Sequence, residues 1–148
     1  MAKVHVDGLK ETEKALWEID KHTTRKSLAR RVLKKAGQPL ADDMNRLAPD
    51  DESTEGGLNQ SYAVSTKLNK SQKRATRREK KDDVFMYVGT NDPAGLQQEF
   101  GNIIHAAQPH ARPAWDSGKG RALDDIKTEL GTEIMKAAKR QANKKARN

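Results

Sequence analysis

The stretch Gln98-Glu99-Phe100-Gly101, continuing to His110-Ala111-Arg112-Pro113-Ala114-Trp115, decides how this chain folds. Within these residues lie one of two Phe, one of two Trp, two of four His and two of five Pro, in a protein that is otherwise rich in charge. Before it, Asp92 and Pro93 favour the start of a short helix, and Gly101 favours its end. The stretch is therefore predicted to connect this helix to the last helix of the chain.

The helices on either side are predicted from the spacing of apolar residues. An amphipathic helix is expected over 8–21, and a long helical stripe follows from Leu28 to Leu47. Gly37 and Pro39 interrupt the stripe, which predicts a kink or two consecutive helices. After Pro113, Ala114 and Trp115 are expected to begin a helical turn broken by Gly118 and Gly120, with the final helix running from about Arg121 to Gln141.

Two segments between these helices have strand character. Residues 61–66 and 84–90 are rich in β-branched and aromatic residues and are predicted to pair as antiparallel strands. The predicted fold class is α+β, with a small antiparallel sheet packed against a long kinked N-terminal helix and a C-terminal helix. The 148 residues suit a single domain, and their low apolar content predicts a thin core that is completed against copies of the chain or a partner.

Positive charge is concentrated in two segments. Residues 67–81 carry a net +7 and residues 136–148 a net +6, so a total of +8 leaves −5 for the rest. The connection 67–83 is predicted to be a mobile loop and residues 142–148 a basic tail. This distribution indicates contact with a polyanion or charge-matched assembly. The candidate polyanion contacts are Lys67, Lys70, Lys73, Arg74, Arg77, Arg78, Lys80 and Lys81.

Several classes of function have little support in the sequence. The absence of cysteine excludes disulfides and thiolate metal sites, and no apolar run is long enough to span a bilayer, so a soluble protein made in the cytoplasm is expected. No nucleophile elbow or phosphate-binding loop is present, and no enzymatic activity or cofactor is predicted. A metal site can be drawn from His105, His110, Glu99 and Asp116, but its spacing matches no zinc motif, and polar loop or interface residues are the preferred interpretation.

Three groups of residues resemble a known family when they are taken in order. The first is Ala48-Pro49, followed by Asp51, Thr54-Glu55-Gly56-Gly57-Leu58 and Ser61-Tyr62. The second is Val88-Gly89 followed by Gln98-Glu99-Phe100-Gly101, and the third is Pro109-His110-Ala111-Arg112-Pro113-Ala114. Together they resemble the tail-completion (minor tail component, head–tail joining) family of long-tailed double-stranded DNA bacteriophages. The loop after Pro49 is longer than is typical of the family, and His110-Ala111 replaces a bulkier apolar pair.

The resemblance implies a virion structural protein without enzymatic activity. It implies a ring, hexameric in relatives, at the head-proximal end of the tail, and contact with the tail terminator, the tail tube and the head–tail connector. Non-specific DNA in the lumen of the ring is a further implied partner, and a membrane is not. The implied location is the tail or neck of the virion, after assembly in the host cytoplasm.

On this interpretation, the opening stretch is a rigid corner used for assembly. Gly101 supplies a positive φ, Pro109 and Pro113 stiffen the chain, and Arg112 is predicted to hold Glu99 in a bidentate pair. Trp115 is expected to anchor the returning chain, and the histidines are expected to be exposed contacts. The predicted corner residues are Glu99, Phe100, Gly101, His110, Arg112, Pro113 and Trp115. The alternatives are a sequence-independent nucleic-acid-binding module using 67–81 and the basic C-terminus, and a metal-dependent hydrolase around His105 and His110.

Overall fold

The computed structural model describes residues 14, 22–50, 57–78 and 84–147. The helix predicted over 8–21 lies almost wholly outside this part of the chain, as do Lys80 and Lys81. The architecture is α+β, as predicted. Its elements are α2 (His22–Leu47), the 3-10 turn η1 (Leu58–Gln60), β1 (Ala63–Ser65), α3 (Lys70–Ala75), the 3-10 turn η2 (Thr76–Arg78), β2 (Tyr87–Gly89), α4 (Pro93–Phe100) and α5 (Ala111–Lys145).

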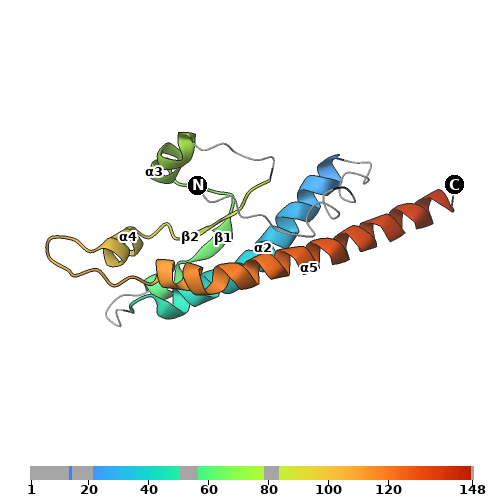
Figure 1. The fold of residues 1–148 in the computed structure, drawn as a ribbon. Coiled ribbons are helices and arrows are strands. Elements are labelled where there is room, and N and C mark those ends of the chain that lie inside the picture. Colours follow the sequence, from blue (N-terminus) through green and yellow to red (C-terminus); the bar gives the residue numbers. More distant parts are fainter. Residues whose placement is uncertain (1–13, 15–21, 51–56, 79–83, 148) are drawn as a thin grey trace.

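The frame of the molecule is the pair of long helices α2 and α5, which lie side by side and run in opposite directions (Figure 1). The predicted stripe on α2 is confirmed for most of its members, because Leu28, Val32, Leu40 and Met44 are all buried. One cluster lies at the end of the pair near the sheet, and a second lies farther along, where Leu28 and Val32 pack against α5. The core is therefore a strip between two helices.

Helix α2 continues through Gly37 and Pro39, so the alternative of two consecutive helices is wrong. Proline removes one backbone donor from the helix. The surrounding packing compensates, because Leu40 and Ala41 are buried directly after the proline. Gly37 faces the sheet, where an added Cβ would lie 3.2 Å from the side chain of Val64. Contacts with the sheet and with α5 thus hold the helix in one piece.

The sheet consists of β1 and β2, paired antiparallel with Val64 opposite Val88. Each strand has three residues and is shorter than the segment predicted from the sequence. Val64 is buried against α2, whereas β2 is only partly covered. The strands end early because a pair this small has one helix to pack on and few side chains to bury.

Helix α5 differs most from the sequence prediction. It forms one helix of 35 residues from Ala111 to Lys145, without the break expected at Gly118 and Gly120. Gly118 is buried, and a Cβ there would lie 2.6 Å from Cδ2 of Leu40 on α2. Glycine weakens an isolated helix, but here it permits a close helix–helix approach. The tail predicted at 142–148 begins as the last turn of this helix.

The basic connection between the strands is partly helical. Residues predicted to belong to a mobile loop form α3 and η2, and α3 begins with a capping box in which Asn69 and Gln72 bond reciprocally. Gln72 also donates to the carbonyl oxygen of Thr90, which ties the helix to the end of β2. The prediction of a loop is therefore wrong over Lys70–Arg78, while the mobility of the segment stays a prediction.

Candidate assembly site

Helix α4 brings the first half of the corner into position. The side chain of Asp92 accepts a hydrogen bond from Ala94 N at 2.9 Å, and Pro93 occupies the first turn. Gly101 has a φ of 73°, and its N–H donates to Gln97 O at 2.7 Å. These are the cap, the proline and the left-handed glycine predicted for this helix. The local sequence thus determines where α4 begins and ends.

The loop after Gly101 is held by its own hydrogen bonds. Asn102 accepts from the backbone N–H groups of Ile104 and His105 at 2.8 Å each, and its own N–H donates to His105 O at 2.9 Å. At the base of the loop, Gln108 N donates to Gln98 O at 2.7 Å. Bonds of this kind fix the turn at its tip, where the side chains of Ile103 and Ile104 are 106% and 83% exposed.

Glu99 joins α4 to α5. The residue is 5% exposed, and its carboxylate accepts the backbone N–H groups of His110, Ala111 and Arg112 at 2.8–3.1 Å. These donors belong to the first turn of α5, where free N–H groups and the helix dipole favour a negative charge. Burial by itself raises the pKa of Glu99, but the hydrogen bonds from these backbone groups and from Arg112 outweigh it and lower the pKa to about 2.

The predicted pair of Arg112 and Glu99 is present with a different geometry. Nε of Arg112 donates to Oε1 of Glu99 at 2.8 Å, while Nη2 donates to the backbone carbonyl oxygen of Glu99 at 3.2 Å. The guanidinium group therefore binds the carboxylate once instead of twice, because the backbone of α5 already occupies the second oxygen. It also lies over the ring of Phe100, 4.9 Å from the centroid. Arg112 covers the corner from the solvent side.

His110 is buried, and the prediction that it is an exposed contact residue is wrong. Its side chain is 1% exposed and packs edge-on against Tyr62. Nδ1 lies 3.0 Å from Gln108 O, and since a carbonyl oxygen only accepts, Nδ1 carries the hydrogen. With the hydrogen on Nδ1, Nε2 accepts from the hydroxyl of Tyr62 at 2.7 Å. Burial, together with the nearby charges of Glu99 and Asp92, raises the pKa of Tyr62 to about 12, so the hydroxyl keeps its proton.

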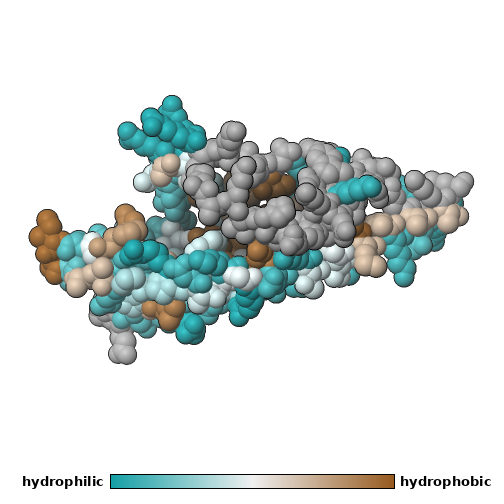
Figure 2. Space-filling view, viewed as in Figure 1, coloured by the Kyte–Doolittle hydropathy of each residue, from teal (hydrophilic) through white to brown (hydrophobic). Residues whose placement is uncertain are grey.

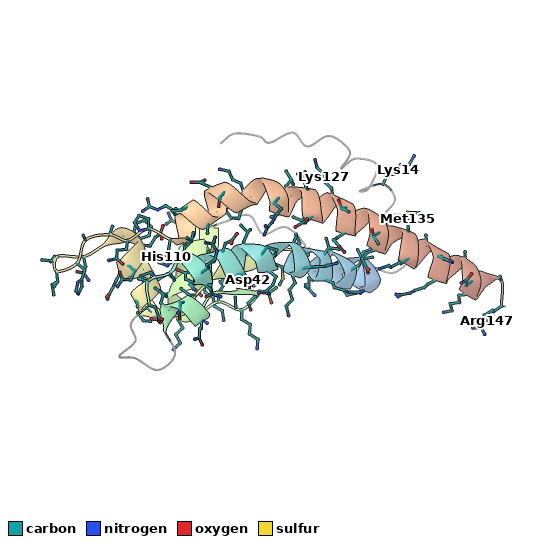
Figure 3. The ribbon with its side chains drawn as sticks, turned by 90° about the horizontal axis from the view of Figure 1, so that it is seen from below. Lys14, Asp42, His110, Lys127, Met135 and Arg147 are labelled. Atoms are coloured by element: carbon teal, nitrogen blue, oxygen red, sulfur yellow. The ribbon has the colours of Figure 1, made fainter. Side chains whose placement is uncertain are left out.

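Trp115 and Pro113 lie in the first turns of α5. Trp115 is 50% exposed, so it does not anchor the returning chain. Ala114 does so instead, because it is fully buried in the cluster with Met44 and Tyr62. Pro113 is the third residue of the helix, where the N–H that proline lacks would have no acceptor within the helix. Figure 3 shows His110 at this end of the helix pair.

The metal site drawn from the corner residues is not formed. Among residues 22–50, 57–78 and 84–147, no group of three His, Asp or Glu side chains is arranged to hold a metal ion. His105 is exposed on the loop, whereas His110 has both ring nitrogens engaged inside the protein. The same part of the chain has no helix that is both long and apolar enough to cross a membrane.

The structure describes six of the eight predicted polyanion contacts, and five of these lie on α3 and η2. Lys67 lies before α3, and the other five described members are exposed on α3 and η2, which project from the body of the molecule (Figure 2).

An open pocket of about 630 Å³ separates α3 from α4. Sequence reasoning missed this pocket and the bond between Tyr62 and His110. It also missed the exposed isoleucines at the loop tip, although an uncharged run from Asn102 to Pro109 in so charged a chain was a visible signal.

The first part of the chain, up to the corner, matches a known family. The model of the family described as "Bacteriophage HK97-gp10, putative tail-component" matches residues 10–101, which is more than half of the 148 residues. The chain belongs to the HK97-gp10-like family. The predicted resemblance to a phage tail family is thus confirmed. No curated protein and no solved structure matches the chain.

The match to the HK97-gp10-like family covers α2, the sheet and α4, and it ends at Gly101. It therefore includes the Ala48-Pro49, Ser61-Tyr62 and Glu99-Phe100-Gly101 motifs. The third motif, Pro109 to Ala114, lies beyond it. In this member of the family, Glu99 physically connects the matched segment to the part of the chain outside the match.

Proposed function

We propose that this protein is a structural component of a bacteriophage tail that self-assembles into a hexameric ring at the head-proximal end of the tail. The ring joins the tail terminator and tail tube to the head–tail connector. The observation that carries the proposal is membership of a family of phage tail components. The proposal assigns the chain no catalytic step and no cofactor, and it places the chain in the neck of the virion after assembly in the host cytoplasm.

The exposed apolar surface around the corner supports an assembly role. Leu96, Phe100, Ile103, Ile104 and Trp115 are 50–106% exposed, and all belong to α4, the following loop or the first turns of α5. Soluble monomers rarely gather large apolar side chains in one exposed region. Burial of these side chains against other subunits or tail proteins would supply the apolar burial that the thin core lacks.

The rigidity of the corner supports the same role. Glu99 and Gly101 fix the angle between α4 and α5, and the hydrogen bonds of Asn102 fix the loop between them. A surface that is ordered before assembly loses less conformational entropy when a partner binds. The corner therefore presents its apolar side chains in a geometry that is already set.

Size-exclusion chromatography with light scattering tests the proposal directly. The purified chain is measured over a range of concentrations, alone, with the tail terminator protein and with the head–tail connector protein of the same phage. A discrete oligomer, or a stable complex with the terminator, is expected. A chain that stays monomeric and binds neither terminator nor connector would contradict the proposal.

A second candidate function is sequence-independent binding of nucleic acid. The observation that favours it is the set of five exposed cations on the nine residues of α3 and η2: Lys70, Lys73, Arg74, Arg77 and Arg78. Such a set can neutralise several phosphates, and the affinity should then fall steeply with salt. In a ring, the same surface would serve as a lining around DNA.

Fluorescence anisotropy with a labelled DNA duplex, measured at several salt concentrations, tests this second candidate. Replacing Lys73, Arg74 and Arg77 by Gln should reduce the slope of log K against log salt by about 0.9 for each phosphate that the variant no longer neutralises. A matched variant with Gln at Lys119, Arg121 and Lys127 on α5 also removes three positive charges, and so controls for net charge. Equal slopes for the two variants would argue against a role for α3 and η2.

A further inference from the structure

The two largest side chains at the tip of the loop between α4 and α5 do not pack on the described part of their own chain. Ile103 is 106% exposed and Ile104 is 83% exposed, so neither packs on the protein that carries it. Figure 2 shows hydrophobic atoms at the end of the molecule where this loop extends beyond α4. The two isoleucines are also held in place, because Asn102 bonds the backbone of Ile104 and His105.

A pocket of about 630 Å³ lies elsewhere on the same chain, between α3 and α4. Its apolar lining includes Tyr62, Ala75, Pro93, Leu96 and Phe100. The volume is in the range of about 300–1,000 Å³ that is typical of sites enclosing a small apolar group. Leu96 and Phe100 are 68% and 61% exposed, so the pocket presents apolar side chains to solvent.

The loop tip and the pocket are both apolar, and neither presents an unpaired charge to the other. The eight residues from Asn102 to Pro109 include no Asp, Glu, Lys or Arg, although 34% of the chain is charged. The pocket has only two charged lining residues, Asp92 and Glu99, and both carboxylates already accept hydrogen bonds from their own chain. Insertion of the tip would therefore bury apolar surface without removing an unpaired charge from water.

We propose that Ile103 and Ile104 of one copy of the chain insert into the pocket between α3 and α4 of a neighbouring copy. The inference rests on the proposed function and identifies the contact by which copies associate. Tip and pocket are different surfaces of one chain, so each copy uses its tip on one neighbour and its pocket on the other. A contact of this head-to-tail kind produces a ring when the rotation between copies closes.

Disulfide trapping between two singly substituted chains tests the contact, because the natural chain has no cysteine to interfere. An untagged Ile103→Cys chain is mixed with an equal amount of an affinity-tagged Leu96→Cys chain under mild oxidation. Random pairing would make half of the covalent dimers mixed. The proposed contact predicts that mixed dimers greatly exceed half. A control mixture of Met135→Cys with Leu96→Cys uses a site that is 75% exposed on the far part of α5, and it should give no excess.

Aspartate variants provide a second, non-covalent test. Ile103→Asp blocks the tip and leaves the pocket intact, whereas Leu96→Asp blocks the pocket and leaves the tip intact. Each variant alone should lose the oligomer in light scattering, and a mixture of the two should form a dimer and nothing larger, because one good contact remains. Circular dichroism verifies that both exposed substitutions leave the fold unchanged, and Met135→Asp should still assemble.

The outcomes separate this contact from the proposed function. If both aspartate variants form the same oligomer as the natural chain, or if mixed disulfides stay at or below half, the tip-in-pocket contact is wrong and a ring built by another contact stands. If the natural chain neither associates with itself nor binds a tail protein, and mixed disulfides show no excess, both proposals fail.

Discussion

Replacement of Glu99 by Gln is the most informative single change, because this carboxylate connects two helices that are separate in sequence. It accepts three backbone N–H groups from the start of α5 and one from the side chain of Arg112. Gln keeps the size and one carbonyl oxygen. It removes the negative charge and directs an amide N–H₂ group toward backbone donors that previously had an acceptor.

The size of the effect follows from the pKa. A carboxyl group whose pKa falls from 4.5 to about 2 on folding contributes at most about 3 kcal/mol to the free energy of unfolding at pH 7. Arg112 is 58% exposed, so solvent screens part of this attraction. We therefore expect Glu99→Gln to lower the free energy of unfolding by about 1.5–3 kcal/mol, and to lower Tm by roughly 2–4 °C for each kcal/mol lost.

The pH dependence provides a second signature of the same group. The pKa of Glu99 is lower in the folded chain than its ordinary value of 4.5. Its stabilisation is therefore complete above about pH 5, and it is lost as the pH falls toward 2, because the unfolded chain then binds a proton that the folded chain does not. The difference in stability between the natural chain and Glu99→Gln should shrink steadily over this window.

Urea unfolding followed by circular dichroism at 222 nm, at pH 7, 5, 4 and 3, measures both effects. Asp124→Asn is the matched control, since this side chain is 77% exposed and lies 3.8 Å from Nζ of Lys127. The control should change stability by no more than about 0.5 kcal/mol. A Glu99→Gln chain as stable as the natural one at pH 7, or a difference that does not change between pH 5 and 3, would refute the reasoning.

Four further substitutions test the packing of the helices and the bond between Tyr62 and His110, each by the same urea titration. Gly118→Val should destabilise the chain by about 1–3 kcal/mol, because its side chain would meet α2, whereas Gly120→Ala faces open space and should add about 0.5–1 kcal/mol; equal effects would contradict the close helix approach. Tyr62→Phe should cost about 1–3 kcal/mol, because it leaves Nε2 of His110 buried without a partner, and no loss would show that the bond contributes nothing. Pro39→Ala should stabilise the chain by about 1–3 kcal/mol by restoring a donor inside α2, and a loss would indicate that the proline ring is needed for packing.

Features governed by neighbouring residues could be predicted from the sequence. Helix α4 has its cap at Asp92, its proline at the first position and its left-handed glycine at Gly101, as its eight residues and their flanks indicate. The apolar stripe of α2 likewise follows from spacing alone, since three- and four-residue steps place Leu28, Val32 and Met44 on one face. The pairing of Glu99 with Arg112 was also predictable, because Arg112 is the one cation between Gln98 and Trp115 and a guanidinium group suits a carboxylate.

The exposure of individual side chains at the corner depends on the tertiary structure. His110 is buried and Trp115 is half exposed, the reverse of what their polarity and size suggest. The reason is the direction of the first turn of α5, which is set by the backbone donors that Glu99 accepts. That direction brings His110 to the hydroxyl of Tyr62 and leaves room inside only for the methyl group of Ala114.

The sequence by itself thus determined the α+β class, the bounds of α4 and the corner at Gly101, because caps, turn residues and periodicity act over a few residues. Tertiary structure decided the continuity of α5 through Gly118 and the pocket between α3 and α4. Both depend on contacts between segments far apart in the chain: α5 packs along α2, and Gln72 bonds to the end of β2. Considered alone, Gly118 predicts a helix break. Packed against Leu40, it allows α5 to approach α2 closely.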